Sequence, residues 1–148
     1  MKKIFSILLT IPIAFQITSG QNRIWHNGQN IFMSGMNLAW INFADDLTNF
    51  NEGVFDLAMR QISEAGGNSV RWWLHVNGAH SPIFTDDMVS GISQTELDNL
   101  ELALSIAQEN HIGLVLCLWS FDMLRTSFGE TITAHNKLML ENETYLNA

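Results

Sequence analysis

The clearest pattern in the chain is a strand over residues 69–75, in which apolar side chains alternate with polar or aromatic ones. Successive side chains of a strand point to opposite faces. One face is wholly apolar and predicts contact with a layer of helices: Val70, Trp72 and Leu74. The other face is unusual for a plain core: Arg71, Trp73 and His75. A buried arginine requires a carboxylate or several other acceptors. Because this strand has no acidic residue, we expect the partner of Arg71 to come from elsewhere.

Helical periodicity precedes and follows this strand. Residues 51–65 place apolar side chains at helical spacing behind a capping asparagine, and the glycine pair 66–67 ends the helix. Residues 93–110 begin with a capping box formed by Ser93 and Glu96. The predicted buried stripes are Val54, Ala58, Ile62 and Ala65 in the first helix, with Phe55 and Met59 beside them, and Leu97, Leu100, Leu104 and Ala107 in the second.

Two further strands flank these helices. The first covers residues 32–40, where Gly35 removes a side chain at a point of close strand approach. The other is the apolar run 112–119, which is typical of a parallel strand buried on both faces. Upstream of both, the Asn-Gly pair at 27–28 predicts a small β-hairpin, because both turn residues must take a positive φ.

The remaining segments are expected to be loops or a helix start. Residues 41–50 form a loop in which Asp45 and Asp46 are expected to be solvated. Residues 76–92 are rich in Asn, Gly, Pro and Asp and predict a long loop. A third helix is expected to begin at Leu138.

The order strand, helix, strand, helix, strand predicts an α/β fold with a parallel sheet. Both a (β/α)8 barrel and an open doubly wound sheet fit, and both place the functional site at the carboxyl ends of the strands. No glycine-rich phosphate loop follows the first strand, which disfavours a dinucleotide-binding sheet. A whole barrel needs about 250 residues. We therefore expect the N-terminal part of a (β/α)8 barrel, with about three strands and two to three helices.

Residues 1–20 have the layout of a secretory signal peptide: a basic start, a short apolar run and small residues before Gln21. The run is short for a membrane span, so we expect no stable membrane insertion after cleavage. The expected location is secreted, periplasmic or at the cell surface. Removing the segment takes the formal charge from −8 to −10, which disfavours nucleic-acid binding. The single cysteine, Cys117, leaves no internal disulfide.

Three stretches resemble glycoside hydrolase family 5 and its relatives in clan A, the cellulase and endo-β-mannanase group. They are the hairpin leading to Ser34-Gly35-Met36-Asn37, the run Gly66-Gly67-Asn68-Ser69-Val70-Arg71, and the run from Val115 to Asp122. The resemblance implies that residues 21–148 are an incomplete catalytic domain. The third stretch reads Leu118-Trp119-Ser120, where many cellulases of the family carry a histidine. A tryptophan there is closer to the mannanase side of the clan.

The resemblance implies a retaining hydrolase of a β-linked polysaccharide, mannan or glucan. Its acid/base and nucleophile are two glutamates expected beyond Ala148, so the fragment would be inactive alone. Arg71 would orient the nucleophile. The candidate substrate-binding residues lie in the strands or directly after them: Asn37, Trp40, Trp73, His75, Asn77, Trp119, Ser120 and Asp122. Each also has a structural interpretation, as a core aromatic, a satisfied histidine or a loop residue.

Two alternatives remain open at this point. One is a non-catalytic carbohydrate-binding protein on the same barrel scaffold. The other is an open-sheet α/β protein that binds another small molecule. The sequence contains no HExxH motif or close histidine pair, so we expect no catalytic metal, and no cofactor is expected.

Overall fold

The computed structural model describes residues 24–146, so the predicted signal peptide lies outside the described residues. The chain divides into two units, residues 1–32 and residues 33–148. The first unit contains the antiparallel hairpin of β1 (Ile24–His26) and β2 (Gln29–Ile31). Its turn residues, Asn27 and Gly28, have φ values of 49° and 74°. The hairpin prediction is therefore confirmed.

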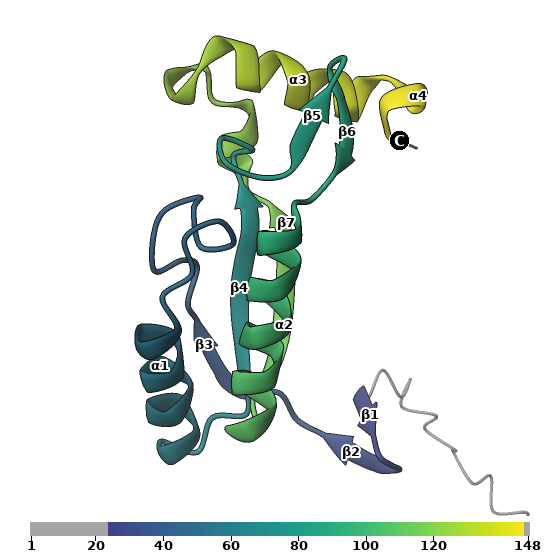
Figure 1. Cartoon of the computed structure of the whole chain (residues 1–148). Coiled ribbons are helices and arrows are strands. Elements are labelled where there is room, and N and C mark those ends of the chain that lie inside the picture. Colours follow the sequence, from purple (N-terminus) through teal and green to yellow (C-terminus); the bar gives the residue numbers. More distant parts are fainter. Residues whose placement is uncertain (1–23, 147–148) are drawn as a thin grey trace, which may run out of the picture. The chain divides into compact units, whose positions relative to one another are not determined.

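The second unit is built on a three-stranded parallel sheet (Figure 1). Its strands are β3 (Gly35–Asn37), β4 (Ser69–Val76) and β7 (Gly113–Trp119), in the order β3-β4-β7. Helix α1 (Glu52–Glu64) connects β3 to β4, and helix α2 (Gln94–Glu109) precedes β7. The alternation of strands and helices predicted from the sequence is confirmed.

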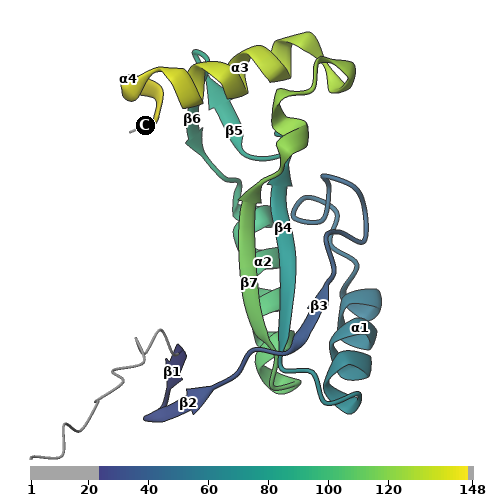
Figure 2. The ribbon, with the colours of Figure 1, turned by 180° about the vertical axis from the view of Figure 1, so that it is seen from behind.

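Both helices pack against the apolar face of β4, and the view from behind shows no helix of residues 24–146 on the opposite face of the sheet (Figure 2). Val70 and Trp72 are fully buried there, and Leu74 is 5% exposed. They join one core cluster with residues of α1 and α2: Phe55, Met59, Ile62, Ala103, Ile106 and Ala107. The face predicted from the alternation of residues 69–75 is the face that the helices cover.

The helix ends follow the predicted signals. The side chain of Asn51 accepts a hydrogen bond from the amide of Val54, and Ser93 and Glu96 form the capping box of α2. At the end of α1, Gly66 takes a φ of 85°, as a helix C-terminus in the left-handed conformation requires. His111 takes the corresponding position after α2, with a φ of 58°.

The predicted helix stripes need correction. Val54, Leu97 and Leu104 are between 39% and 44% exposed. The apolar residues of each helix are compatible with more than one buried stripe. Packing against the sheet determines which residues are buried. In α1 the larger side chains Phe55 and Met59 enter the core. In α2 the alanines Ala103 and Ala107 face the sheet, because small side chains allow the helix to approach it closely.

The loop predicted over residues 76–92 is also corrected, because it contains an antiparallel hairpin. Its strands are β5 (Ile83–Thr85) and β6 (Met88–Gly91). Asp86 and Asp87 form the turn with φ values of 51° and 63°. Asp tolerates this conformation less readily than Gly but better than most residues, so the pair was a weak hairpin signal.

The third helix begins earlier than predicted. After two short 3-10 helices, at Phe121–Leu124 and Thr126–Phe128, α3 covers Glu130–Glu141 and α4 covers Glu143–Leu146. Gly129 occupies the N-cap of α3 without a side-chain cap. The start at residue 130 therefore lacked a capping signal that the sequence could reveal.

Strand β7 is less covered than predicted. It pairs with β4 on one side and has no second neighbour among residues 24–146. Val115 is 42% exposed and Leu118 is 55% exposed, so the predicted burial on both faces is wrong for this part of the chain. Within the same residues, no helix is long and apolar enough to cross a membrane.

Candidate substrate-binding site

The candidate site begins where β3 and β4 lie side by side. Asn37 and Arg71 are register partners in these parallel strands, so their side chains emerge on the same face. Nη1 of Arg71 donates a hydrogen bond to Oδ1 of Asn37 at 3.1 Å. The Arg71 guanidinium also lies 4.5 Å from the centroid of the Trp73 ring. Arg71 is exposed, and these partners replace the carboxylate that burial would have required.

A row of aromatic rings leads outward from Trp73. Its ring centroid lies 5.9 Å from that of Trp40, which is 4.9 Å from Phe43 in an edge-to-face contact. Phe43 stacks on Phe128 at 5.4 Å with an interplanar angle of 25°. Sequence reasoning missed Phe43 and Phe128. Phe43 lies in the loop after β3 and Phe128 ends a short 3-10 helix, and no local pattern indicates that the fold brings the two together.

His75 has a different environment from Arg71 and Trp73. The pairing of β4 with β7 shifts between Trp73 and Val76, so that Val76 pairs with Trp119. The alternation of side chains between the two faces of the sheet is interrupted there, so it does not by itself determine which face His75 lies on. The His75 ring is buried, and its centroid lies 5.3 Å from that of Trp119.

Two serines and a glutamate complete the surroundings of His75. Nδ1 of His75 lies 2.7 Å from Oγ of Ser81. Burial lowers the pKa of His75, and the negative charge of Glu96 offsets part of that effect. Burial alone would raise the pKa of Glu96. Hydrogen bonding from Ser81 and Ser93, with attraction to His75, outweighs burial and leaves that pKa lowered.

Asn77, Ser120 and Asp122 are engaged with the protein itself. Oδ1 of Asn77 accepts a hydrogen bond from the amide of Ala79 at 3.0 Å. Oγ of Ser120 accepts one from the amide of Asp122 at 3.1 Å. The Asp122 carboxylate pairs with Arg125 at 3.1 Å. These contacts shape the loops at the strand ends.

Asn136 of α3, which sequence reasoning missed, joins two of these loops. Its Nδ2 donates to the backbone oxygens of Asn77 and Met123, at 2.7 and 2.9 Å, and its side chain is fully buried. A single asparagine on a helix surface carries no sequence signal of this role. Its position depends on how α3 folds back over the end of β4.

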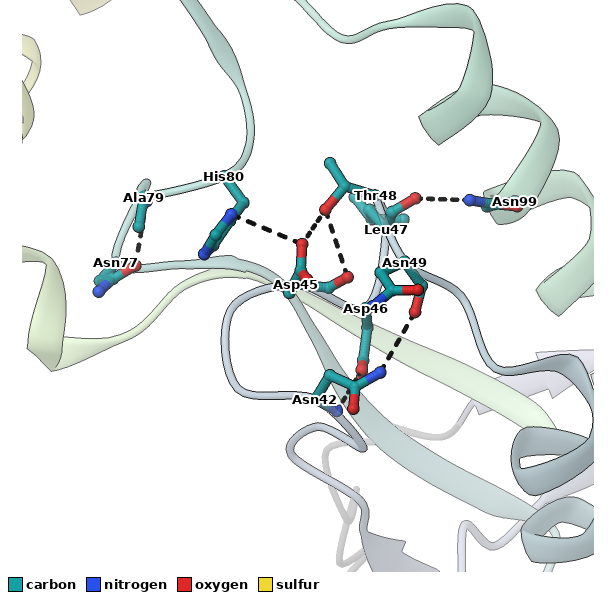
Figure 3. Close-up of polar contacts among 10 residues, drawn as sticks. All are labelled: Asn42, Asp45, Asp46, Leu47, Thr48, Asn49, Asn77, Ala79, His80 and Asn99. Carbon is teal, nitrogen blue, oxygen red and sulfur yellow. Dashed lines mark hydrogen bonds and ion pairs between the residues drawn. The ribbon is translucent and has the colours of Figure 1, made fainter.

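The loop over residues 41–50 is organised by Asp46 (Figure 3). Asp46 is 3% exposed and accepts hydrogen bonds from the amides of Ile41 and Asn42, at 2.9 and 2.6 Å. Its Oδ2 also accepts from Nε1 of Trp72 at 2.9 Å. The prediction that this carboxylate is solvated is wrong, because three donors compensate its burial.

The neighbouring Asp45 connects two loops. Its carboxylate accepts a hydrogen bond from the Thr48 hydroxyl and lies 3.6 Å from Nδ1 of His80 (Figure 3). On α2, the side chain of Asn99 donates to the carbonyl of Leu47 at 2.7 Å. The segment between β3 and α1, which carries Trp40 and Phe43, is therefore held from both sides. Within residues 24–146, no group of three or more His, Cys, Asp or Glu side chains could hold a metal ion.

A parallel sheet with helices on one face, and with basic, amide and aromatic side chains gathered on the other face and beyond the carboxyl ends of its strands, is the arrangement of a (β/α)8-barrel site. No family model matches the chain. It is 33% identical over 126 residues to the mannan endo-1,4-beta-mannosidase of Mytilus edulis, covering 77% of this chain and 34% of that protein. It is 30% identical over 134 residues to the enzyme of the same name from Cryptopygus antarcticus, covering 81% and 35%.

Solved structures agree with these relatives. The β-mannanase of the blue mussel Mytilus edulis superposes with a TM-score of 0.72 at 28% identity, over 84% of this chain and 35% of that one. The β-1,4-D-mannanase of Cryptopygus antarcticus gives a TM-score of 0.72 at 25% identity, over 83% and 34%. The chain thus spans about a third of the length of each of these relatives.

The comparisons confirm the resemblance to the mannanase side of the clan. They also confirm the fold, because the structural relatives are (β/α)8 barrels and the three parallel strands with their helices are part of such a barrel. The open doubly wound sheet is therefore set aside. The roles of individual site residues stay predictions.

Proposed function

We propose that the protein carrying this chain is a secreted retaining glycoside hydrolase that cleaves β-1,4-linked mannan. The observation that supports this most directly is the contact of Asn37, at the end of β3, with Arg71, which lies against Trp73 on the same face of the adjacent strand β4. The relatives of this chain are mannan endo-1,4-beta-mannosidases, and this similarity favours mannan over glucan as the substrate. Secretion rests on the signal-peptide layout of residues 1–20.

The catalytic carboxylates are proposed to lie outside these 148 residues. Three buried acidic side chains near the strand ends already have structural partners. Asp46 accepts from Trp72 and two amides, Asp122 pairs with Arg125, and Glu96 closes the capping box of α2. A retaining enzyme needs one carboxylic acid and one free carboxylate about 5–5.5 Å apart. None of these three carboxylates is free for that work.

In this proposal Arg71 positions the nucleophile. Its guanidinium is fixed at one end by Asn37 and from one side by the Trp73 ring. Its remaining N–H groups can donate to a carboxylate that enters from elsewhere. Such a contact holds the nucleophile in its ionised form and in a fixed orientation, as displacement at the anomeric carbon requires.

The test is an assay of the protein expressed at the full length that its gene encodes. We expect release of reducing ends from β-1,4-mannan, and much slower release from β-1,4-glucan. Arg71→Lys is expected to lower kcat/KM roughly a hundredfold, because a lysine cannot reproduce the two-sided geometry of the guanidinium.

Arg60→Lys is the matched control. Arg60 lies on the surface of α1, where it pairs with Asp56 at 3.1 Å, and such exposed pairs contribute little. Equal losses of kcat/KM in Arg71→Lys and Arg60→Lys would contradict the proposed role of Arg71. Tight mannan binding without hydrolysis would favour the non-catalytic carbohydrate-binding protein. Faster cleavage of β-1,4-glucan than of β-1,4-mannan would contradict the proposal that mannan is the substrate.

A further inference from the structure

The segment Asn142-Glu143-Thr144, at the junction of α3 and α4, has no role in the proposed function. It fits the acceptor pattern for N-linked glycosylation, which is an asparagine, any residue except proline, and then a serine or threonine. No other asparagine in the 148 residues stands two positions before a serine or threonine. An attached glycan is bulky and hydrophilic, so the pattern has meaning only where the asparagine lies at the surface.

The structure places Asn142 at the surface, as the single residue between the two helices. Its backbone N–H donates to the carbonyl of Leu138 at 2.9 Å and closes the last turn of α3. Its φ of −119° and ψ of 116° are extended, so the helix ends there. Its Oδ1 accepts a hydrogen bond from the amide of Thr144 at 3.0 Å. This contact is an Asx turn, which starts α4.

The Asx turn engages the side-chain oxygen of Asn142 and leaves the side-chain nitrogen free. Within residues 24–146, Nδ2 of Asn142 donates no hydrogen bond. Nδ2 of Asn136, by contrast, is held in the interior by two backbone oxygens. Because the Asx turn joins residues only two positions apart, it can form in the chain before the tertiary fold is complete.

The part of α3 next to Asn142 is solvated. Lys137 and Glu141 form an ion pair at 3.8 Å, and their side chains are 62% and 64% exposed. Burying such a pair is costly, so we expect this flank of α3 to stay in solvent in the full-length protein. Leu138 and Leu140 are 37% and 51% exposed, and an attached glycan would cover part of this apolar surface.

We propose that Asn142 is a site of N-linked glycosylation, which receives an oligosaccharide from a polyprenyl-diphosphate donor in the secretory pathway. A bond forms between Nδ2 of Asn142 and C1 of the first sugar, and the bond from C1 to the diphosphate breaks. Nδ2 loses one proton, and the diphosphate leaves with the electron pair of the broken bond. The inference rests on the secretion included in the proposed function, and not on the hydrolysis of mannan. One relative comes from the blue mussel, an animal, and animal cells supply such donors.

The test uses the full-length protein secreted by cultured mammalian cells. Trypsin cleaves after Lys137, and the peptide that begins at Leu138 is treated with peptide N-glycosidase in heavy-oxygen water and analysed by mass spectrometry. We expect most of the secreted protein to yield heavy-oxygen-labelled aspartate at position 142. Secreted protein in which Asn142 is unmodified overturns the proposal. If residues 1–20 do not direct secretion, a replacement signal peptide delivers the chain to the same compartment, and the same peptide gives the answer.

Three variants separate the acceptor pattern from the fold. Thr144→Ala removes the hydroxyl but keeps the backbone amide that bonds to Oδ1 of Asn142, and it should abolish the modification. Glu143→Pro should abolish it too. Proline suits the first position of α4, and Asn142 already has the extended conformation that a residue before proline prefers. Thr144→Ser is the matched control and should keep the modification.

The outcomes distinguish this inference from the proposed function. A glycan that stays on Asn142 in Thr144→Ala and Glu143→Pro would contradict the assigned acceptor pattern. If the secreted protein carries the glycan and does not hydrolyse mannan, the proposed function fails and the inference stands. If hydrolysis is normal and Asn142 is unmodified, only the inference fails.

Discussion

Nε1 of Trp72 donates a hydrogen bond to Oδ2 of Asp46 at 2.9 Å, and both side chains are buried. The two residues belong to different parts of the molecule, the helix-covered face of β4 and the loop after β3. The same carboxylate accepts from the amides of Ile41 and Asn42. Asp46 therefore ties the loop that carries Trp40 and Phe43 to the hydrophobic core.

Removing this carboxylate should destabilise the protein substantially. Asp46→Ala leaves the Trp72 indole and two backbone amides without their acceptor in a buried place, so we expect a loss of about 3 kcal/mol in the free energy of unfolding. Asp45→Ala is the control, because Asp45 is partly exposed and contacts Thr48 and His80 at the surface. Urea unfolding measures both. Equal losses for the two variants would contradict the assigned role of Asp46.

Gly35 should not tolerate even the smallest side chain. A Cβ at this position would lie 1.6 Å from the backbone oxygen of Ser69, which belongs to the neighbouring strand. Gly35→Ala must therefore break the pairing of β3 with β4, and we expect little folded protein. Gly53→Ala in α1 is the matched control, because its Cβ would meet nothing within 4 Å. It should stabilise the helix by about 0.5–1 kcal/mol. Soluble yield and thermal unfolding distinguish the two.

The outer end of the aromatic row should contribute to the binding of longer substrates. Phe43 and Phe128 stack on each other and are 37% and 39% exposed, so a sugar could pack on them. Phe128→Ala is expected to raise KM for a long mannooligosaccharide about fivefold, with kcat nearly unchanged. Phe121→Ala is the control, because Phe121 is more exposed and contacts Arg125 instead of the row. A rise in KM for the control alone would place the binding surface elsewhere.

Local signals were sufficient for the hairpin of β1 and β2, the order of the three parallel strands and the helices α1 and α2. The alternation of residues 69–75 predicted which face of β4 the helices cover, and Asn51 and Ser93 marked the helix starts. Gly35 was predicted at a close strand approach, and it lies against Ser69. In each case the determining interaction joins residues close together in the sequence or follows from strand geometry.

The site depended on contacts that no local pattern contains. Asp46 looks like any loop aspartate until the fold brings Trp72 to it. Phe128 becomes part of an aromatic row only when its loop returns to Phe43. The register shift near the end of β4 changes what surrounds His75, and the alternation of residues 69–75 gives no sign of a single inserted residue. Long-range packing, and not propensity, decides these positions.

The buried pair of His75 and Glu96 makes the stability of the protein depend on pH. The pKa of His75 is lowered from 6.5 in the folded state, chiefly by burial. Well above pH 6.5 the His75 ring is neutral in both the folded and the unfolded state, so it does not contribute to the pH dependence of the free energy of unfolding. As pH falls below 6.5 the unfolded chain takes up a proton that the folded chain resists, so the free energy of unfolding falls. The lowered pKa of Glu96 adds a second decline as pH falls below 4.5.

His75→Gln separates the first decline from the second. Between about pH 7.5 and about pH 5, the variant should lose less stability than the wild-type protein, whatever its absolute stability, because the group that titrates there is gone. His80→Gln is the control, since the side chain of His80 is half exposed and lies 3.6 Å from Asp45 at the surface. Urea unfolding at a series of pH values gives the slopes. A His75→Gln variant that loses as much stability as the wild-type protein over this window would contradict the assignment of the first decline to His75.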